Sequence, residues 1–164
     1  MGQIFSPERL IELRSEWRRE RKRVVAAAGA FDLLHPGHIR LLEQARDLGD
    51  VLIVAVEDDD RVRRAAKGPA AAAQPVTPQA ERAEVLAALA AVDFVTELRE
   101  MSVSNWIDRF QPHIYVHGGA ATAPRSASAV YEDKDAAGVQ IVSIPLEPGY
   151  SSALLIERIQ QFPQ

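Results

Sequence analysis

Two histidines, His35 and His38, stand three residues apart, directly after a turn at residues 29–34. The turn follows an apolar run at residues 24–28 and precedes a helix-like run at residues 39–48. Residues three apart are neighbours on one face of a helix, so both imidazoles would face the same ligand. Free N–H groups at a helix start attract phosphate, and imidazoles beside them stabilise the negative charge that grows in phosphoryl transfer. The pattern predicts a phosphate-handling site.

Two further residues of this stretch suit that role. Pro36 fits the first helical position, because its missing N–H would have no partner there in any case. Gly37 has no Cβ, so a phosphate can come close to the backbone. The alternative is that the two histidines cap a helix in a purely structural role.

The composition sets broad limits on the fold and on the partners. With 164 residues, 47% of them hydrophobic, the chain is expected to form one globular domain. The absence of cysteine excludes disulfides and thiolate metal sites and is compatible with the cytoplasm, where we expect the protein. No apolar run approaches the roughly 20 residues that span a bilayer, so no membrane partner is expected. A net charge of −4 argues against nucleic acid.

The N-terminal part, residues 1–23, is expected to form a helical arm. Ser6 would cap its helix, with Pro7 at the first helical position. The basic run at residues 18–23 has two interpretations, an anion-binding or nucleic-acid-binding patch and the solvated face of a helix, and the second is the commoner.

From residue 24 to residue 164 the sequence alternates strand-like and helix-like segments. Such alternation predicts a Rossmann-like α/β fold, a doubly wound parallel sheet with helices on both faces, in one domain. Ligands of these sheets lie beyond the carboxyl ends of the strands. His35, Glu57, His117 and the loop at residues 145–152 all fall at such ends.

The segment from Phe31 to His38 resembles the FDxxHxGH signature of the cytidylyltransferase-like nucleotidyltransferases. Members of that superfamily join a nucleoside triphosphate to a phosphorylated acceptor and release pyrophosphate. The resemblance implies Mg²⁺ that arrives with the triphosphate and keeps most of its waters. The acidic run at residues 57–60 could hold a cation, although a solvated loop that caps the next helix is the simpler interpretation, so no protein metal site is expected.

Further segments resemble the heptose-1-phosphate adenylyltransferase type within that superfamily. Its Lys-Gly, followed by Pro-Val-x-Pro and a helix with an arginine, matches Lys67-Gly68, Pro75–Pro78 and Arg82. Its P-G-Y-S-T-T element matches residues 148–153. The alternatives are an exposed loop lysine at position 67, a structural salt bridge at Arg82 and an ordinary serine N-cap before the last helix.

The sequence departs from this type at several polar positions. The usual V-K-G-G-D-Y is replaced at residues 116–121, where His117 stands for the lysine and alanines stand for the aspartate and tyrosine. Ala28 and Ala30 replace polar residues before the histidine motif. Glu57 replaces the asparagine of V-N-x-D, although Asp59 remains. These changes leave the fold intact and fall where the base, ribose and acceptor would lie.

The resemblance implies a nucleotidyltransferase that uses ATP or CTP and a sugar or polyol phosphate. The catalytic residues would be His35, His38 and Lys67. The nucleotide would be bound by Gly29, Ala30, Phe31, Asp32, Gly37, Arg82, Gly118, Gly149, Tyr150, Ser151 and Ser152, with Asp32 fixing the turn or a histidine tautomer. The acceptor would be bound by Glu57, Asp59, His117 and Gly119. A homodimer is expected by analogy. The alternative function is a non-catalytic nucleotide-binding homologue, a sensor or scaffold.

Overall fold

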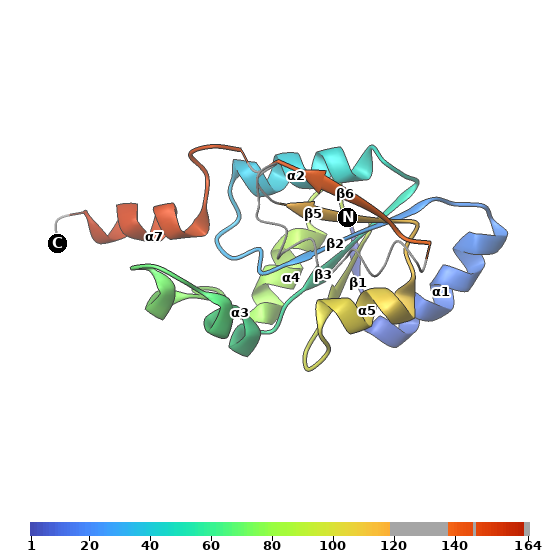
Figure 1. The fold of residues 1–164 in the computed structure, drawn as a ribbon, viewed down its shortest axis with the longest axis horizontal. Helices are drawn as coiled ribbons and strands as arrows, with labels where there is room; N and C mark the ends of the chain where they lie inside the picture. The colour runs from blue at the N-terminus through green and yellow to red at the C-terminus, as the bar shows by residue number, and fades with distance from the viewer. Residues whose placement is uncertain (119–137, 146, 163–164) are drawn as a thin grey trace.

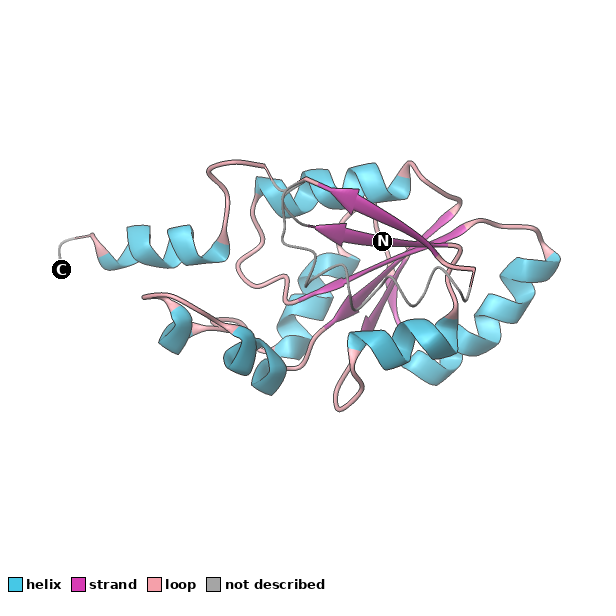
Figure 2. Ribbon diagram, viewed as in Figure 1, coloured by secondary structure: helices cyan, strands magenta, loops and turns pink. Residues whose placement is uncertain are grey.

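The computed structural model describes residues 1–118, 138–145 and 147–162. Within this part of the chain, six strands form one sheet in the order β1-β4-β3-β2-β5-β6, and all neighbouring strands are parallel. The strands are β1 (Gln3–Ile4), β2 (Val24–Gly29), β3 (Val51–Val56), β4 (Phe94–Glu97), β5 (Ile114–Gly118) and β6 (Gln140–Ile144). The predicted parallel α/β sheet is confirmed (Figure 2).

Helices cover both faces of the sheet (Figure 1). They are α1 (Pro7–Arg19), α2 (Pro36–Arg46), α3 (Asp59–Ala65), the short 3-10 turn η1 (Ala71–Ala73), α4 (Gln79–Ala87), α5 (Val103–Phe110) and α7 (Ser152–Gln160). One hydrophobic core places Leu42 of α2 and Leu86 of α4 against one face, and a second places Leu10 of α1 and Trp106 of α5 against the other. Every residue of β3 is buried, which explains its uninterrupted apolar sequence.

The N-terminal segment is part of the sheet as well as a helical arm. Ser6 caps α1 by accepting a hydrogen bond from the N–H of Arg9, as predicted. Strand β1 was not predicted; its two residues pair with Phe94 and Val95 of β4 and form the edge of the sheet. No helix of the described residues is long and apolar enough to cross a membrane.

The strand order contains one reversal that determines where a ligand can bind. The chain runs from β2 through β3 to β4 on one side, then returns to the other side of β2 with β5 and β6. β2 pairs with β3 up to Gly29 and with β5 up to Ala27. Parallel sheets of this kind bind ligands outside the carboxyl ends of the strands at such a reversal. The turn after β2 and the end of β5 therefore flank the expected ligand position.

Candidate active site

His35 and His38 form a stacked pair at the start of α2. His35 is the N-cap residue, and its Nδ1 accepts a 3.4 Å hydrogen bond from the backbone N–H of His38. The two ring centroids are 3.8 Å apart, with 17° between the ring planes. Because Nδ1 of His35 is an acceptor, its proton is on Nε2, which can donate to a ligand. His35 thus caps the helix, and its Nε2–H is left to donate to a ligand.

Burial determines the protonation state of the pair. The pKa of His38 is lowered to about 4, mainly by burial and to a smaller extent by the neighbouring His35, while Asp32 acts in the opposite direction. Burial also lowers the pKa of His35. Both rings are therefore neutral at pH 7 and act as N–H donors rather than as cations. Nδ1 of His38 is buried and has no hydrogen-bond partner among the described residues, which is typical of a group that awaits a ligand.

The turn before the histidines has an uncommon backbone. Phe31 has φ 49° and Leu33 has φ 45°, values that residues with a Cβ rarely adopt. Asp32 lies between them, is buried, and its two carboxylate oxygens accept hydrogen bonds from the N–H groups of Val76 (2.8 Å) and Thr77 (3.0 Å). Of the two roles expected for Asp32, the geometry supports fixing the turn, because its partners are backbone groups of the 76–77 loop and not a histidine ring.

Arg82 is a buried connector at the same edge of the sheet. Its side chain is 1% exposed and forms an ion pair with Asp59. It also donates to the carbonyl oxygens of Ala30, Glu57 and Thr77. These bonds join the ends of β2 and β3 to the start of α4. The geometry favours the structural salt bridge at Arg82 over the predicted nucleotide contact. The Asp59 carboxylate, which was expected to bind the acceptor, is the partner of Arg82 in this ion pair.

The start of α7 is hydrogen-bonded to the turn at residues 29–34, which is called the histidine turn below. Ser151 caps the helix by accepting from the N–H of Leu154 at 3.1 Å, and the hydroxyl of Ser152 donates to the carbonyl oxygen of Asp32. Gly149 has φ 87°, a conformation that favours glycine. The O–H of Ser152 is thus used within the protein, whereas Ser151 only accepts in its cap bond and can still donate its O–H to an anion, beside the N–H groups of the first turn.

Gly37 has a packing role that its predicted phosphate role did not include. A Cβ at this position would lie 3.1 Å from the ring of His35 and 3.1 Å from the Cβ of Tyr150. Such contacts are tighter than ordinary packing allows, so glycine lets the two side chains meet over α2. The rings of His35 and Tyr150 are 6.2 Å apart between centroids.

The remaining predicted residues lie around this centre. Glu57 and His117 end up at the carboxyl ends of β3 and β5, where burial raises the pKa of Glu57 and lowers that of His117. Gly118 is the last residue of β5 and pairs with Ile144. Lys67 is exposed on the loop after α3, which Figure 1 places on the side of the sheet where α7 also lies. Gly119, with Ala120 and Ala121, lies outside the described residues.

The structure adds one group that motif analysis missed. Arg40 of α2 forms an ion pair with Glu147, and its guanidinium carbon lies 5.7 Å from the centre of the Tyr150 ring. The sequence contained a weak signal for this, because Arg40 is three residues after Gly37 and so shares its helix face.

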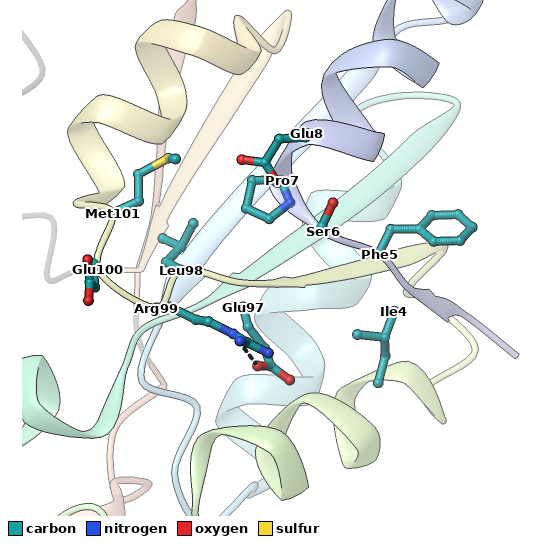
Figure 3. Close-up of a pocket in the computed structure, with 10 residues that line it drawn as sticks. All are labelled: Ile4, Phe5, Ser6, Pro7, Glu8, Glu97, Leu98, Arg99, Glu100 and Met101. Atoms are coloured by element: carbon teal, nitrogen blue, oxygen red, sulfur yellow. Dashed lines mark ion pairs between the residues drawn. The ribbon is translucent and has the colours of Figure 1, made fainter.

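A separate pocket of about 630 Å³ lies where the N-terminal arm meets the end of β4 (Figure 3). None of the predicted site residues lines it. Three carboxylates, those of Glu8, Glu97 and Glu100, lie in its wall, and its one guanidinium, Arg99, is paired with Glu97 at 3.6 Å. This excess of negative charge would repel a triphosphate, so the pocket is not a candidate for nucleotide.

The fold and the histidine-capped helix at the strand reversal define a nucleotidyltransferase-type α/β domain. A sequence profile of the cytidylyltransferase-like family matches residues 26–158, and the chain belongs to this family. The predicted resemblance, including that to the heptose-1-phosphate adenylyltransferase type, is confirmed.

Relatives at the sequence level agree with this assignment. The chain is 39% identical over 157 residues to the bifunctional protein HldE of Koribacter versatilis and 40% identical over 158 residues to that of Rhodopseudomonas palustris. Each match covers 96% of this chain and 31% of the relative, so the chain spans about a third of the length of these relatives.

Two solved structures support the fold alone, because their identities are low. A lipopolysaccharide core biosynthesis protein from Thermoplasma volcanium has a TM-score of 0.62 at 24% identity, covering 77% of this chain and 97% of its own. A pantoate-beta-alanine ligase from Francisella tularensis, solved with an ATP analogue and beta-alanine, has a TM-score of 0.64 at 14% identity, covering 99% of this chain and 80% of its own.

Proposed function

We propose that the chain transfers a nucleoside monophosphate from ATP or CTP to a sugar or polyol phosphate and releases pyrophosphate. The observation that carries this proposal is the stacked pair of His35 and His38 at the start of α2, beside the strand reversal. A helix N-terminus with two aligned imidazole donors suits the phosphate at which charge develops.

In the proposed reaction, a phosphate oxygen of the acceptor attacks the α-phosphorus of the triphosphate in line. A new P–O bond forms there, and the bond from the α-phosphorus to the bridging oxygen breaks, so that pyrophosphate leaves with the electron pair. Neutral His35 and His38 donate N–H hydrogen bonds to oxygens of the α-phosphate. Such catalysis consists of positioning and charge stabilisation, and no side chain needs to form a covalent bond.

The leaving pyrophosphate would lie between the start of α7 and Lys67. The first N–H groups of α7 lack intrahelical partners and favour an anion. Lys67 is exposed and would approach the phosphates from its loop. The buried Asp32 accepts hydrogen bonds from the N–H groups of Val76 and Thr77 in the same loop. These bonds hold the loop of Lys67 against the turn that precedes His35.

Mg²⁺ would enter bound to the triphosphate. Among the described residues, no group of three or more histidine, aspartate or glutamate side chains could hold a metal ion. Mg²⁺ prefers oxygen ligands and keeps several waters, so phosphate oxygens and water would hold the ion, which would neutralise phosphate charge. The protein's own residues then orient the phosphates around it.

The acceptor is proposed to differ from heptose 1-phosphate. The residues that handle phosphate in the resembled enzymes, such as His35, His38 and Lys67, are retained, whereas Ala28, Ala30 and His117 replace polar or charged residues of the base and acceptor positions. A site adapted to another acceptor would keep the transfer chemistry and change its acceptor contacts. A smaller and less charged contact surface suits another sugar or polyol phosphate.

The test is a pyrophosphate-release screen of ATP and CTP against a panel of sugar and polyol phosphates, with nucleotide binding measured by calorimetry. We expect binding of a Mg-triphosphate and turnover with at least one acceptor other than heptose 1-phosphate. Binding without turnover across a broad panel would favour a nucleotide sensor or scaffold instead. No binding of either triphosphate would exclude both functions.

A further inference from the structure

Four planar side chains lie next to one another across the start of α2, three from α2 and its N-cap residue and one from the loop before α7. His38 stacks on His35 at 3.8 Å, His35 lies 6.2 Å from Tyr150, and the guanidinium of Arg40 lies 5.7 Å from the Tyr150 ring. The Tyr150 ring is therefore next to both the catalytic imidazole and a cation. A cation within about 6 Å of a ring centre is attracted to it.

The approach of Tyr150 to His35 depends on Gly37, the residue below them. A Cβ at position 37 would meet both side chains at 3.1 Å. Residues 37 and 40 share a face of α2, so the loop that carries Tyr150 crosses the helix over these two positions. The contact between this loop and His35 therefore depends on the glycine at position 37 of α2.

The same loop is fastened at two points. Glu147, before Tyr150, is paired with Arg40, and Ser152, after it, donates to the carbonyl oxygen of Asp32. Between these points the loop includes Gly149 at φ 87° and leads into the N-terminus of α7. The Arg40–Glu147 pair therefore holds the side of the loop that precedes Tyr150, and the Ser152 bond holds the start of α7.

We propose that Arg40 is a positioning residue of the transfer reaction. Through its ion pair with Glu147 and its place over Tyr150, it holds the 147–150 loop against His35 and sets the distance between the imidazole donors and the first turn of α7. This inference rests on the proposed function, in which the imidazole donors contact the α-phosphate and the first turn of α7 contacts the leaving pyrophosphate. Arg40 itself touches no reacting atom.

The exposure of the ion pair suits such a role. The side chains of Arg40 and Glu147 are 49% and 38% exposed, so salt screens their attraction. A weak and solvent-exposed ion pair lets the 147–150 loop open for product release, whereas a buried ion pair would keep the loop closed.

The test compares the wild type with Arg40→Ala, Glu147→Ala and the charge-reversed double variant Arg40→Glu/Glu147→Arg. Each single variant should lower kcat about fivefold, the most that an exposed ion pair commonly contributes. The KM for the acceptor should stay within about twofold, since the predicted acceptor residues belong to other elements. The reversed pair should restore part of kcat, because it recovers the ion pair but not the cation beside the Tyr150 ring. Raising the salt concentration should lower kcat of the wild type and leave that of Arg40→Ala unchanged.

Arg9→Ala is the matched control, because Arg9 and Glu12 form an exposed ion pair on the remote helix α1. If Arg40→Ala behaves like Arg9→Ala, or if charge reversal restores nothing, the proposal is overturned. The NMR signal of the His35 ring gives a second readout that needs no activity. It should move in Arg40→Ala and Glu147→Ala but not in Arg9→Ala, and an unmoved signal would overturn the proposal even if the wild type proved inactive.

Discussion

The imidazole rings of His35 and His38 lie almost parallel, 3.8 Å apart, and the backbone N–H of one is capped by the ring of the other. This relationship couples the start of a helix to the orientation of two donors. Since both rings are neutral at pH 7, each offers one N–H to an incoming oxyanion. The pair is therefore preorganised before substrate binds, and this is the property on which electrostatic catalysis depends.

His38→Ala should lower turnover by at least about 100-fold, the typical loss on removing one oxyanion-type donor. The affinity for triphosphate should change much less, because the donor acts mainly on charge that develops in the transition state. Single-turnover kinetics and calorimetry measure the two effects. Gln44→Ala, at an exposed position of the same helix, serves as the control. Near-normal turnover in a folded His38→Ala protein would remove the pair from the mechanism.

Acidification should destabilise the protein through His38. The folded-state pKa of His38 is about 4, below its ordinary value of 6.5, so the unfolded chain binds a proton that the folded protein does not. The contribution of this group to stability is complete well above pH 6.5 and falls as the pH drops through 6.5 towards 4, by about 1.5 kcal/mol between pH 6.5 and 5.

Urea unfolding at both pH values, compared with His38→Asn, isolates this contribution, because the other histidines are common to the two proteins. The variant should lose about 1.5 kcal/mol less than the wild type on acidification. Equal losses in the two proteins would show that His38 does not carry the effect.

Bound Mg-triphosphate should protect residues 66–78, between α3 and α4, from proteolysis, and Lys67→Gln should abolish that protection. Elastase cleaves after alanine, and the segment contains the exposed Ala72 and Ala73, so the substitution neither removes nor adds a cleavage site. Lys22→Gln, on the remote side near Glu20, is the matched control. Equal cleavage with and without nucleotide would make the segment an uninvolved surface loop.

Arg82→Ala should lower the free energy of unfolding by about 3–5 kcal/mol, because it leaves the carboxylate of Asp59 and three carbonyl oxygens without their partner. Chemical denaturation measures this change. Arg63→Ala breaks an exposed ion pair with Asp60 on the neighbouring helix and should stay within about 0.5 kcal/mol of the wild type. Equally small losses of unfolding free energy in the two variants would mean that Arg82 does not hold the ends of β2 and β3 to the start of α4.

Much of the architecture follows from local patterns. The alternating strands and helices of the parallel sheet, the cap Ser6 and the helix that begins at Pro36 were all predicted, because period, capping and proline chemistry act over a few residues. The edge strand β1 was not predicted, because two residues carry no period and their pairing partner in β4 is about 90 residues away. The same local logic indicated the histidine pair and its helix.

Local sequence patterns were enough to predict the family, the parallel fold and the residue types of a phosphate-handling site. The tertiary structure alone decided the partners of those residues. It enclosed Arg82 among carbonyl oxygens, joined Asp32 to the 76–77 loop and placed Arg40 over Tyr150. These contacts join residues 25 to 110 positions apart, and a motif specifies which side chains exist but not which distant backbone groups surround them. Burial, charge pairing and strand order decide that, and all three are properties of the folded chain.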